Sequence, residues 1–388
     1  MKLLVLSSRF PLPLEKGDKL RLYHQIKYLS QNHEIILVTL AEKPFDQTLV
    51  KDMQAYCTEI YVIPLDRRVN LFNAAWGLWQ GLPLNIGYFY SRATKRKIDG
   101  IIEKTRPDLI YVQLLRMAPY VRYRSAQEMS IDYMDAFSLR VLRRAKQSNI
   151  LVRFLWAIEA KLLERQEKTY AKQFKNRFII ANPDRLFLEQ RKLVEDLTVL
   201  RNGVDTAFFQ PKPTVEKEFD LVFVGNMSYH PNILAAEYLV EEIAPLLKKE
   251  YPGLKVLIAG ADPVPGVKKL ASDEVVVSGY MEDIREAYGA GKIFVAPIFA
   301  GSGMQNKILE AMAMELPCVT TPQVIDAIGG IENLVSSAAN SGEFVKHLLN
   351  LLGNTTKRME LGRLSREYIV KNLSWEASCS PLDKLNCP

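Results

Sequence analysis

The residues best suited to ligand binding and catalysis lie in the stretch GSGMQNKILEAMAMELPCVTT, which begins at Gly301. Gly301, Ser302 and Gly303 form a small-residue turn between an apolar run and a helical stretch, where backbone N–H groups can bind an anion. Lys307 and Glu310 are three residues apart and therefore share one helical face. A cation and a carboxylate so placed can bind the diphosphate and the hydroxyls of one ligand, which indicates a nucleotide-sugar pocket. For the turn alone, an ordinary strand-turn-helix is the alternative.

This segment resembles the sugar-nucleotide signature of retaining glycosyltransferases of family 4, which have the two-domain GT-B fold. The resemblance implies that Glu310 binds the donor ribose and that the glycine-rich turn holds the diphosphate. It extends to the Asn-Gly-Val-Asp segment at Asn202, where family chains enter their second domain, and to loops after further strand-like runs. The other residues that it implies in donor binding are Gly225 and Asn226, and, beside the nucleobase, Gly279, Tyr280 and Met281.

Two features depart from the family pattern. Ser302 stands eight positions before Glu310, where the family has the first of two glutamates. Asn226 and Pro231 stand where it often has an Arg and a Lys for the diphosphate. Lys307 and backbone amides must therefore carry more of the phosphate charge, or a basic group from the other domain must help. With no obvious nucleophile, we expect front-face attack assisted by the leaving phosphate, with no cofactor and no metal ion.

Length and composition fit two domains. The chain has 388 residues, which is more than one hydrophobic core usually supports. Its hydrophobic content of 48% is ample for burial. No run of 18 apolar residues occurs and the chain starts directly with a strand-like run, so we expect a cytoplasmic protein. The four cysteines show no zinc-ligand spacing and are expected to be buried or incidental thiols.

The pattern predicts an α/β protein with the GT-B fold, in which two Rossmann-like, doubly wound domains face each other across a cleft. We expect residues 1–200 to form the acceptor-side domain and residues 201–369 the nucleotide-sugar-binding domain. Residues 370–388 are expected to pack back on the first domain, with Ser380–Pro388 as a frayed tail. The strand-like runs that carry this prediction are Lys2–Ser7, Glu34–Leu40, Ile60–Ile63, Leu109–Val112, Leu221–Val224, Lys255–Ile258, Val275–Val277 and Ile293–Ile298.

Ligands of such sheets bind at the carboxyl ends of the strands, so the loop after Lys2–Ser7 should border the site. It resembles the family's N-terminal loop, in which Gly17 would approach the donor. Arg21 and His24, on the following helix, are acceptor-side candidates, with a solvated helix face as the alternative. Gln113 stands where family enzymes often have a histidine, and Arg116 follows it. We take both as further acceptor-side candidates.

Charge is divided unevenly along the chain. Residues 1–200 carry 33 Lys and Arg against 21 Asp and Glu, a net charge of +12, and the rest carry a net charge of −5. An anionic partner of the first half is therefore expected. No nucleic-acid-binding motif accompanies the charge. Aromatic and basic residues within Val69–Lys97 favour an anionic membrane surface at the inner face, with an interior helix pair as the alternative. Leu139–Lys175 is predicted as amphipathic helix with a solvated charged face.

These features predict a retaining hexosyltransferase of cell-surface polysaccharide or glycan synthesis. It would use a UDP- or GDP-sugar and a carbohydrate or lipid-linked acceptor. Two alternatives remain: a nucleotide-sugar epimerase or hydrolase on the same fold, and a non-catalytic nucleotide-sugar-binding partner within an assembly. The four His residues leave few acid-base groups for the former, while Ser302, Asn226 and Gln113 keep the latter open.

Overall fold

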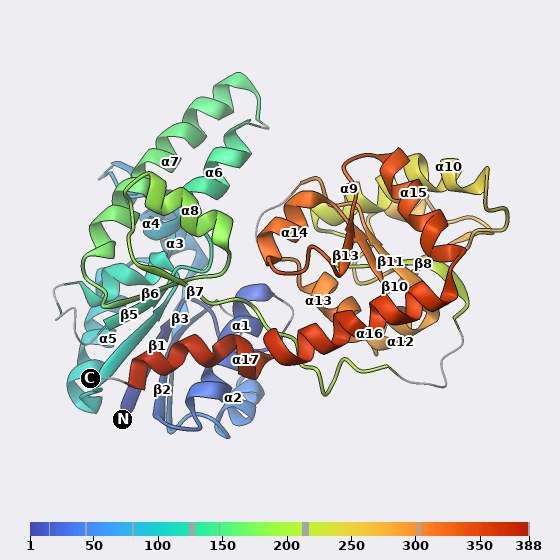
Figure 1. The fold of residues 1–388 in the computed structure, drawn as a ribbon. Coiled ribbons are helices and arrows are strands. Elements are labelled where there is room, and N and C mark those ends of the chain that lie inside the picture. Colours follow the sequence, from blue (N-terminus) through green and yellow to red (C-terminus); the bar gives the residue numbers. More distant parts are fainter. Residues whose placement is uncertain are drawn as a thin grey trace. The chain divides into compact units, whose positions relative to one another are not determined.

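A computed structural model of the chain describes residues 1–14, 16–42, 45–79, 81–122, 124, 129–146, 148–211, 217–300 and 304–386. The chain divides into two compact units, Met1–Arg201 with Cys379–Pro388, and Asn202–Ser378. Each unit has one parallel sheet flanked by helices (Figure 1). This confirms the predicted α/β class. Among the described residues, no helix has both the length and the apolar character needed to cross a membrane.

The first unit alternates strands and helices along the chain. Its elements are β1 (Lys2–Ser7), α1 (Gly17–Leu29), β2 (Glu34–Glu42), α2 (Thr48–Met53), β3 (Glu59–Leu65), α3 (Arg67–Trp79), α4 (Leu84–Phe89), α5 (Arg92–Thr105), β4 (Leu109–Gln113), the 3₁₀ helix η1 (Leu115–Val121), β5 (Met129–Asp132), α6 (Phe137–Lys146), α7 (Ile150–Ala171), β6 (Asn176–Ile179), α8 (Asn182–Gln190), β7 (Leu197–Val199) and the 3₁₀ helix η4 (Ser380–Asn386).

The first sheet has the order β3-β2-β1-β4-β5-β6-β7, and all its strands are parallel. β1 lies in the middle and pairs with β2 from Lys2 to Ser7 and with β4 from Leu3 to Leu6. Helices cover both faces of such a sheet, so its central strands are apolar on both sides. This burial of both faces explains the short runs of Val, Ile and Leu in the sequence.

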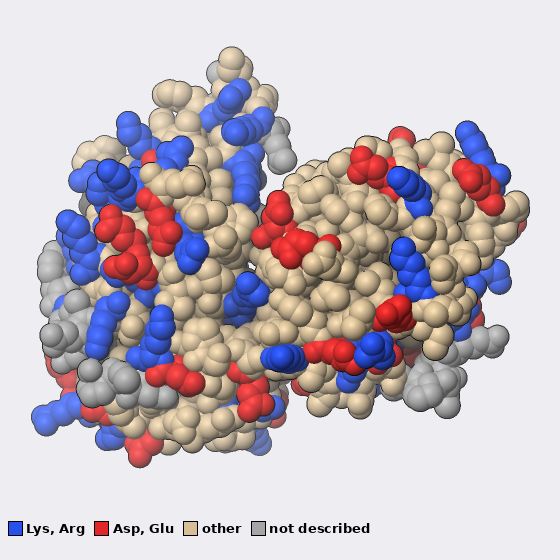
Figure 2. All heavy atoms as spheres, viewed as in Figure 1, with Lys and Arg blue, Asp and Glu red and all other residues tan. Residues whose placement is uncertain are grey.

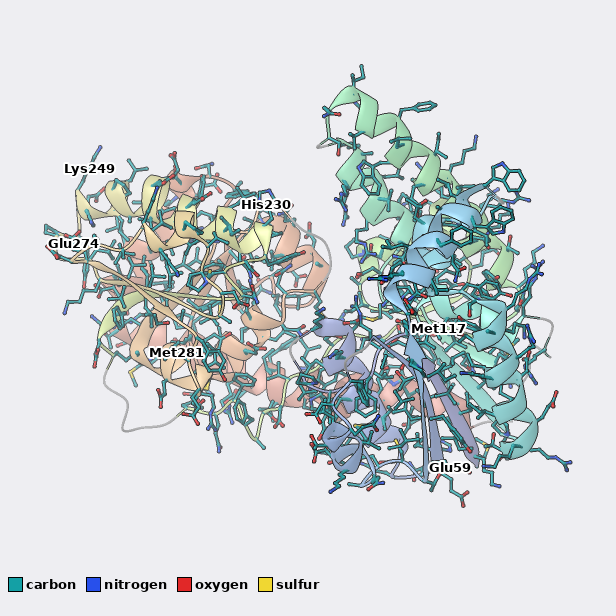
Figure 3. The ribbon with its side chains drawn as sticks, turned by 180° about the vertical axis from the view of Figure 1, so that it is seen from behind. Glu59, Met117, His230, Lys249, Glu274 and Met281 are labelled. Atoms are coloured by element: carbon teal, nitrogen blue, oxygen red, sulfur yellow. The ribbon has the colours of Figure 1, made fainter. Side chains whose placement is uncertain are left out.

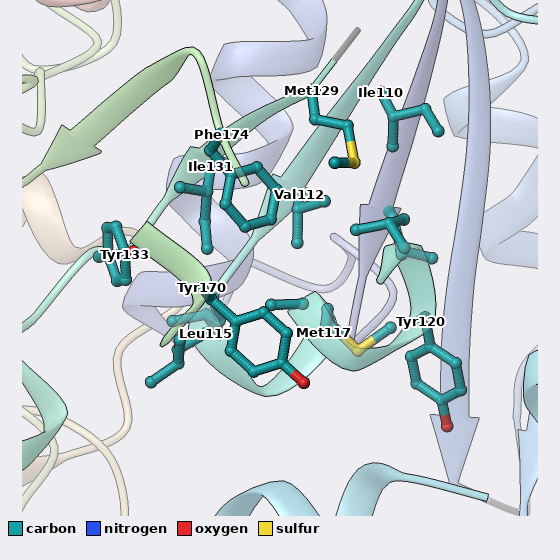
Figure 4. Packing of buried hydrophobic residues seen from close by; sticks show 14 of the residues in the cluster. Ile110, Val112, Leu115, Met117, Tyr120, Met129, Ile131, Tyr133, Tyr170 and Phe174 are labelled. Atoms are coloured by element: carbon teal, nitrogen blue, oxygen red, sulfur yellow. The ribbon is translucent and has the colours of Figure 1, made fainter. Parts of the chain in front are cut away.

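β4, β5, η1 and the end of α7 meet in the core of the first unit. Side chains from all four segments are buried together there, and η1 follows β4 after a single residue. η1 is thereby fixed at the carboxyl end of the sheet. The residues at this centre are Ile110, Val112, Leu115, Met117, Tyr120, Met129, Ile131, Tyr170 and Phe174 (Figure 4).

One ion pair is fully enclosed in the first unit. Arg21 Nε of α1 lies 2.6 Å from Asp132 Oδ2 at the end of β5, and neither side chain is exposed. Gln25 Nε2 and Tyr111 Oη also donate to that oxygen, at 2.8 and 3.3 Å. Burial alone would lower the pKa of Arg21, but the Asp132 carboxylate more than offsets it and the pKa is raised. This network fixes α1 against β4 and β5.

The second unit has the same alternation. Its elements are β8 (Phe219–Val224), α9 (His230–Tyr238), the π-helix η3 (Leu239–Ile243), α10 (Ala244–Lys248), β9 (Val256–Ala259), α11 (Pro265–Lys268), β10 (Val275–Gly279), α12 (Ile284–Ala290), β11 (Gly291–Ala296), α13 (Asn306–Ala313), β12 (Cys318–Thr320), α14 (Pro322–Ile328), β13 (Val335–Ser337), α15 (Ser341–Leu352), α16 (Thr355–Asn372) and α17 (Trp375–Cys379). The parallel strands are ordered β10-β9-β8-β11-β12-β13.

The loops after β8 and β9 touch through glycine. Gly260 has a φ of +136°, and a Cβ atom there would lie 1.9 Å from the carbonyl oxygen of Gly225. Its N–H donates to Gly279 O at 3.0 Å, and the N–H of Gly225 donates to Ala259 O at 3.0 Å. Only glycine fits position 260. The loops after β8, β9 and β10 are thus joined into one edge.

The chain returns to the first unit at Cys379, so residues 370–378 lie in the second unit. Within that unit, Trp375 N–H donates to Val204 O at 3.2 Å. The expected frayed tail is wrong over Ser380–Asn386, because this segment is the helix η4, in which Leu382 and Leu385 are buried. Its apolar residues pack on the first unit.

We expect Arg21→Met to destabilise the first unit by about 3–5 kcal/mol, because it leaves the Asp132 carboxylate buried without its partner. Urea unfolding followed by circular dichroism measures this. The double variant Arg21→Met/Asp132→Leu should recover part of the loss, and Arg68→Met, at an exposed position, should cost less than about 0.5 kcal/mol. A loss below 1 kcal/mol for Arg21→Met would show that the pair does not hold the unit together.

Candidate functional site

Lys307 lies in the first turn of α13, close to the loop after β8. Its Nζ donates to Asn232 Oδ1 of α9 and lies 5.1 Å from the centre of the Phe223 ring. Burial lowers the pKa of the Lys307 ammonium to about 8, against the opposing effect of the Glu310 carboxylate. The structure therefore holds this cation in a partly dehydrated place, where an anion would be bound strongly.

Glu310, one turn further along α13, is held by a buried tyrosine. Tyr288 Oη of α12 donates to Glu310 Oε2 at 2.7 Å, and the Tyr288 side chain is fully buried. Burial raises the pKa of Glu310, whereas the hydrogen bond from Tyr288 and the charge of Lys307 oppose that rise. One carboxylate oxygen is thus used to orient the group. The second remains a hydrogen-bond acceptor for a ligand.

Asn232 connects Lys307 to the loop after β8. Its Nδ2 donates to the carbonyl oxygen of Asn226 at 2.8 Å. A Cβ atom on Gly225 would lie 2.7 Å from that Nδ2 and 3.1 Å from Lys307 Nζ, so the glycine makes room for both groups. Asn226 itself is exposed, and its Oδ1 accepts from Ser228 N at 2.9 Å. Gly225, Asn226 and Lys307 therefore lie at one place.

The nucleobase candidates follow β10 on the same edge. Gly279 has a φ of +71°, Tyr280 has 77% of its surface exposed and Met281 is half-buried. Figure 3 shows His230 at one end of the second unit, Lys249 and Glu274 at the opposite end, and Met281 between them. Gly301, Ser302 and Gly303, the predicted diphosphate turn, lie outside the described residues.

A second polar cluster lies in the first unit, at the carboxyl ends of β1 and β4, and Asp18 is its centre. Gln113 Nε2 donates to the Asp18 carbonyl oxygen at 2.8 Å. Arg9 and Arg116 approach Asp18 Oδ2 at 2.7 and 3.5 Å. Gly17 adjoins Asp18 at the start of α1, and, apart from its chain neighbours and its own helix backbone, no described atom lies within 4 Å of where its Cβ would be. The structure thus brings Gly17, Gln113 and Arg116 together.

Arg116 is nearly enclosed in this cluster. Its Nε donates to Ser8 Oγ at 2.7 Å, and its guanidinium carbon lies 4.3 Å from the centre of the Phe89 ring. Burial and the charge of Arg9 lower the pKa of Arg116 to about 9, while Asp18 opposes this. Positive groups therefore crowd one carboxylate here, which makes the cluster receptive to an anionic or hydroxyl-rich ligand.

Arg21 and His24 do not belong to this cluster. Arg21 forms the enclosed pair with Asp132, so its guanidinium has no surface on which to meet an acceptor. His24 is also buried and lies edge-to-face on Tyr23, with ring centres 5.1 Å apart. The acceptor-side assignment of Arg21 is therefore wrong, because its charge pairs with Asp132 in the core. The solvated helix face, the alternative for both residues, is equally wrong.

Asn232 and Tyr288 are site residues that the sequence pattern does not single out. Asn232 follows Pro231 in the first turn of α9. Tyr288 lies 22 positions before Glu310, and no local spacing relates them. The amide at the start of the helix after β8 is a sequence signal that could have identified Asn232, whereas no sequence signal identifies Tyr288.

Comparison with known proteins bears on the family and the fold. Residues 218–354 match the family model for glycosyl transferases group 1. Over the whole chain, the fold is similar to that of sucrose-phosphate synthase from Thermosynechococcus elongatus, with a TM-score of 0.69, 14% identity and coverage of 100% of this chain and 98% of that one. The fold is GT-B, and together with the domain match it supports a glycosyltransferase of the GT-B kind.

Two more proteins are similar to this chain over almost its whole length. The Anabaena protein HepE, in a structure with UDP, gives a TM-score of 0.66 at 14% identity, covering 100% of this chain and 99% of that one; other structures of it hold UDP with glucose, and UDP-glucose. An uncharacterised 44.6 kDa protein in the cps region of Klebsiella pneumoniae is 21% identical over 415 residues, covering 99% of this chain and 100% of the relative.

The environment of Lys307 can be tested without any ligand. We expect its modification by acetic anhydride, followed by peptide mass spectrometry, to rise with a midpoint near pH 8, because only the uncharged amine reacts. Asn232→Asp should move that midpoint upward, since a carboxylate beside the ammonium favours the charged form. Free N-acetyl-lysine amide in the same buffer is the reference. A midpoint for Lys307 equal to that of this reference compound would contradict the burial of this cation.

Proposed function

We propose that the protein transfers a hexose from a UDP- or GDP-sugar to a carbohydrate or lipid-linked acceptor, with retention at the anomeric carbon. The observation that carries this proposal is the placement of Lys307 and Glu310 on one face of α13, with Lys307 Nζ at the loop after β8. The UDP and UDP-glucose in the HepE structures support a nucleotide-sugar donor. The Klebsiella relative from a capsule (cps) region supports a role in cell-surface polysaccharide synthesis.

In this proposal, Lys307 stabilises the leaving diphosphate. The bond between the anomeric carbon and the phosphate oxygen breaks, and negative charge grows on that oxygen. A cation held in a dehydrated place by Asn232 stabilises this charge without reorganising in the transition state. Lys307 thereby supplies the positive charge, and we propose that no metal ion is required.

Glu310 binds and orients the donor in this scheme. Its free carboxylate oxygen accepts hydrogen bonds from the ribose hydroxyls, while Tyr288 holds the other oxygen. Gly279, Tyr280 and Met281 would contact the nucleobase, and Gly301–Gly303 the diphosphate. Ser302 stands where the family has its first glutamate, so front-face attack remains our proposed route to retention. The acceptor hydroxyl oxygen forms the new bond to the anomeric carbon as the bond to the phosphate oxygen breaks, and the hydroxyl proton passes to that phosphate oxygen.

The Asp18 cluster is proposed to receive the acceptor. Gln113 and Arg116 are themselves buried and orient Asp18 at the carboxyl end of β4, and the exposed Gly17 beside Asp18 leaves room for the acceptor. Incubation with UDP- and GDP-sugars and sugar-lipid acceptors tests the function as a whole. Transfer supports it, donor consumption without an acceptor would favour an epimerase or hydrolase, and binding without turnover would favour a non-catalytic partner.

Glu310→Gln should weaken donor binding while the fold stays intact. Each lost charge-assisted hydrogen bond costs about 1.5–3 kcal/mol, which corresponds to roughly a 10- to 150-fold weaker Kd. Calorimetric titration with the donor measures the affinity, and circular dichroism checks the fold. Tyr288→Phe is the matched control: it keeps the carboxylate and removes only its support, so the loss should be smaller. An unchanged affinity for Glu310→Gln would exclude the ribose role.

Lys307→Ala should reduce turnover more than it reduces nucleoside binding, because the ammonium acts chiefly on charge that develops at the leaving group. Steady-state transfer kinetics and titration with the free nucleoside provide the two numbers. Lys249→Ala, a surface change in the same unit, should alter neither. If turnover of Lys307→Ala stays within a factor of two of the parent, the phosphate is held elsewhere.

A further inference from the structure

The first unit exposes two groups of large apolar side chains that the site does not use. One group is on α3 and includes Trp79, which is 79% exposed. The other is on the N-terminal half of α7 and includes Ile150 and Phe154, which are 83% and 68% exposed. We call these residues together the docking surface: Leu71, Phe72, Trp76 and Trp79 of α3, and Ile150, Phe154, Leu155 and Ile158 of α7.

This surface corrects two expectations. The interior helix pair, the alternative for Val69–Lys97, is wrong for α3, whose aromatic side chains face outward; the rings of Phe72, Trp76 and Trp79 lie beside one another, with successive centres 6.5 and 5.1 Å apart. The solvated charged face expected for Leu139–Lys175 is also incomplete. In the C-terminal half of α7, Leu163 and Tyr170 are buried in the core while the charged residues of the opposite face are exposed, but the N-terminal half presents apolar residues to solvent.

Helix α4 links these two groups within the first unit. Glu159 of α7 accepts hydrogen bonds from the backbone N–H groups of Leu84 and Asn85 at the start of α4, at 3.0 and 3.5 Å. α4 in turn packs closely on α3, where a Cβ on Gly87 would lie 3.2 Å from the Cα of Ala74. α4 thus lies between α3 and α7 and ties both to one side of the unit.

The charge around the docking surface is predominantly positive. Residues 67–98 and 136–158 contain no Asp or Glu at all, although they contain eleven Lys and Arg. Figure 2 shows Lys and Arg along the hairpin of α6 and α7 that projects in Figure 1. The exposed basic residues in these two runs are Arg68, Arg92, Arg96, Lys97, Arg140, Arg143, Arg144, Lys146 and Arg153.

Apolar and aromatic side chains rimmed mainly by cations match a bilayer interface with anionic headgroups. The location matches as well, because α3 follows β3 and α6 follows β5, both at the carboxyl end of the first sheet. Gln113 and Arg116, the proposed acceptor residues, lie at this same end. A lipid-linked acceptor would therefore present its head next to them.

We propose that the docking surface binds the anionic surface of a lipid bilayer, with the α3 aromatics and the exposed turn of α7 at the headgroup level. The proposal rests on the proposed function only in naming a lipid-linked acceptor as the reason for docking. Binding itself needs neither donor nor acceptor. A failure of transfer and a failure of docking can therefore be told apart.

Flotation of the full chain with liposomes tests the proposal. We expect recovery with phosphatidylcholine vesicles containing 30% phosphatidylglycerol, at least tenfold less with pure phosphatidylcholine, and a steady decline as salt rises from about 0.05 to 0.5 M. Trp76→Ala/Trp79→Ala and, separately, Phe154→Ser/Leu155→Ser should each lower recovery several-fold. Arg143→Glu/Lys146→Glu should do so only with the anionic vesicles.

The matched control is Val276→Ser/Met359→Ser, which removes exposed apolar groups from the second unit and should leave recovery unchanged. Thermal melts followed by circular dichroism confirm that each variant folds. Equal recovery with neutral and anionic vesicles, or flotation of both apolar variants at the parent level, would overturn the proposal. So would a dimer in light scattering that the Phe154→Ser/Leu155→Ser change dissociates, since the surface would then bind a second copy.

Discussion

Every strand in both sheets runs parallel, and this constraint determines where chemistry is possible. Parallel strands place all their carboxyl ends on one edge, so loops far apart in sequence become neighbours there. In the second unit this edge joins the loops after β8, β9 and β10 through Gly225, Gly260 and Gly279. In the first it gathers Asp18, Gln113 and Arg116. Neither cluster could form if the strands alternated in direction.

Burial gives the charged groups of these edges different roles. Arg21 and Asp132 are both enclosed and satisfy each other, so their contribution is to the packing of α1. Lys307 is enclosed against an amide, which orients it without neutralising it, and burial therefore lowers its pKa. A buried cation paired with a carboxylate is a structural ion pair, whereas one beside an amide remains able to bind an anion. Whether the partner of a buried cation is a carboxylate or an amide decides between them.

Much of the fold was predictable because it depends on local signals. The apolar runs that became β1 to β4 and β8 to β11 are short, β-branched and separated by helical stretches. Convergence of Lys307 with Gly225 followed from the resemblance. The roles of Arg21 and Tyr288 were not predictable, because each depends on one partner distant in sequence, Asp132 or Glu310. The apolar character of α7 was hidden as well, because a core helix and an exposed one have the same periodicity there.

The return of the chain at Cys379 has a consequence for biosynthesis. The first unit includes η4, in which Asp383 accepts from Tyr28 of α1 and Lys384 donates to Thr198, at 3.0 Å each. All of Asn202–Ser378 must be translated before η4 exists. At about 5–20 residues per second, the ribosome needs roughly 10 to 35 seconds for that stretch. During this time the first unit lacks a helix that covers it, so it completes its folding only after the second unit has been made.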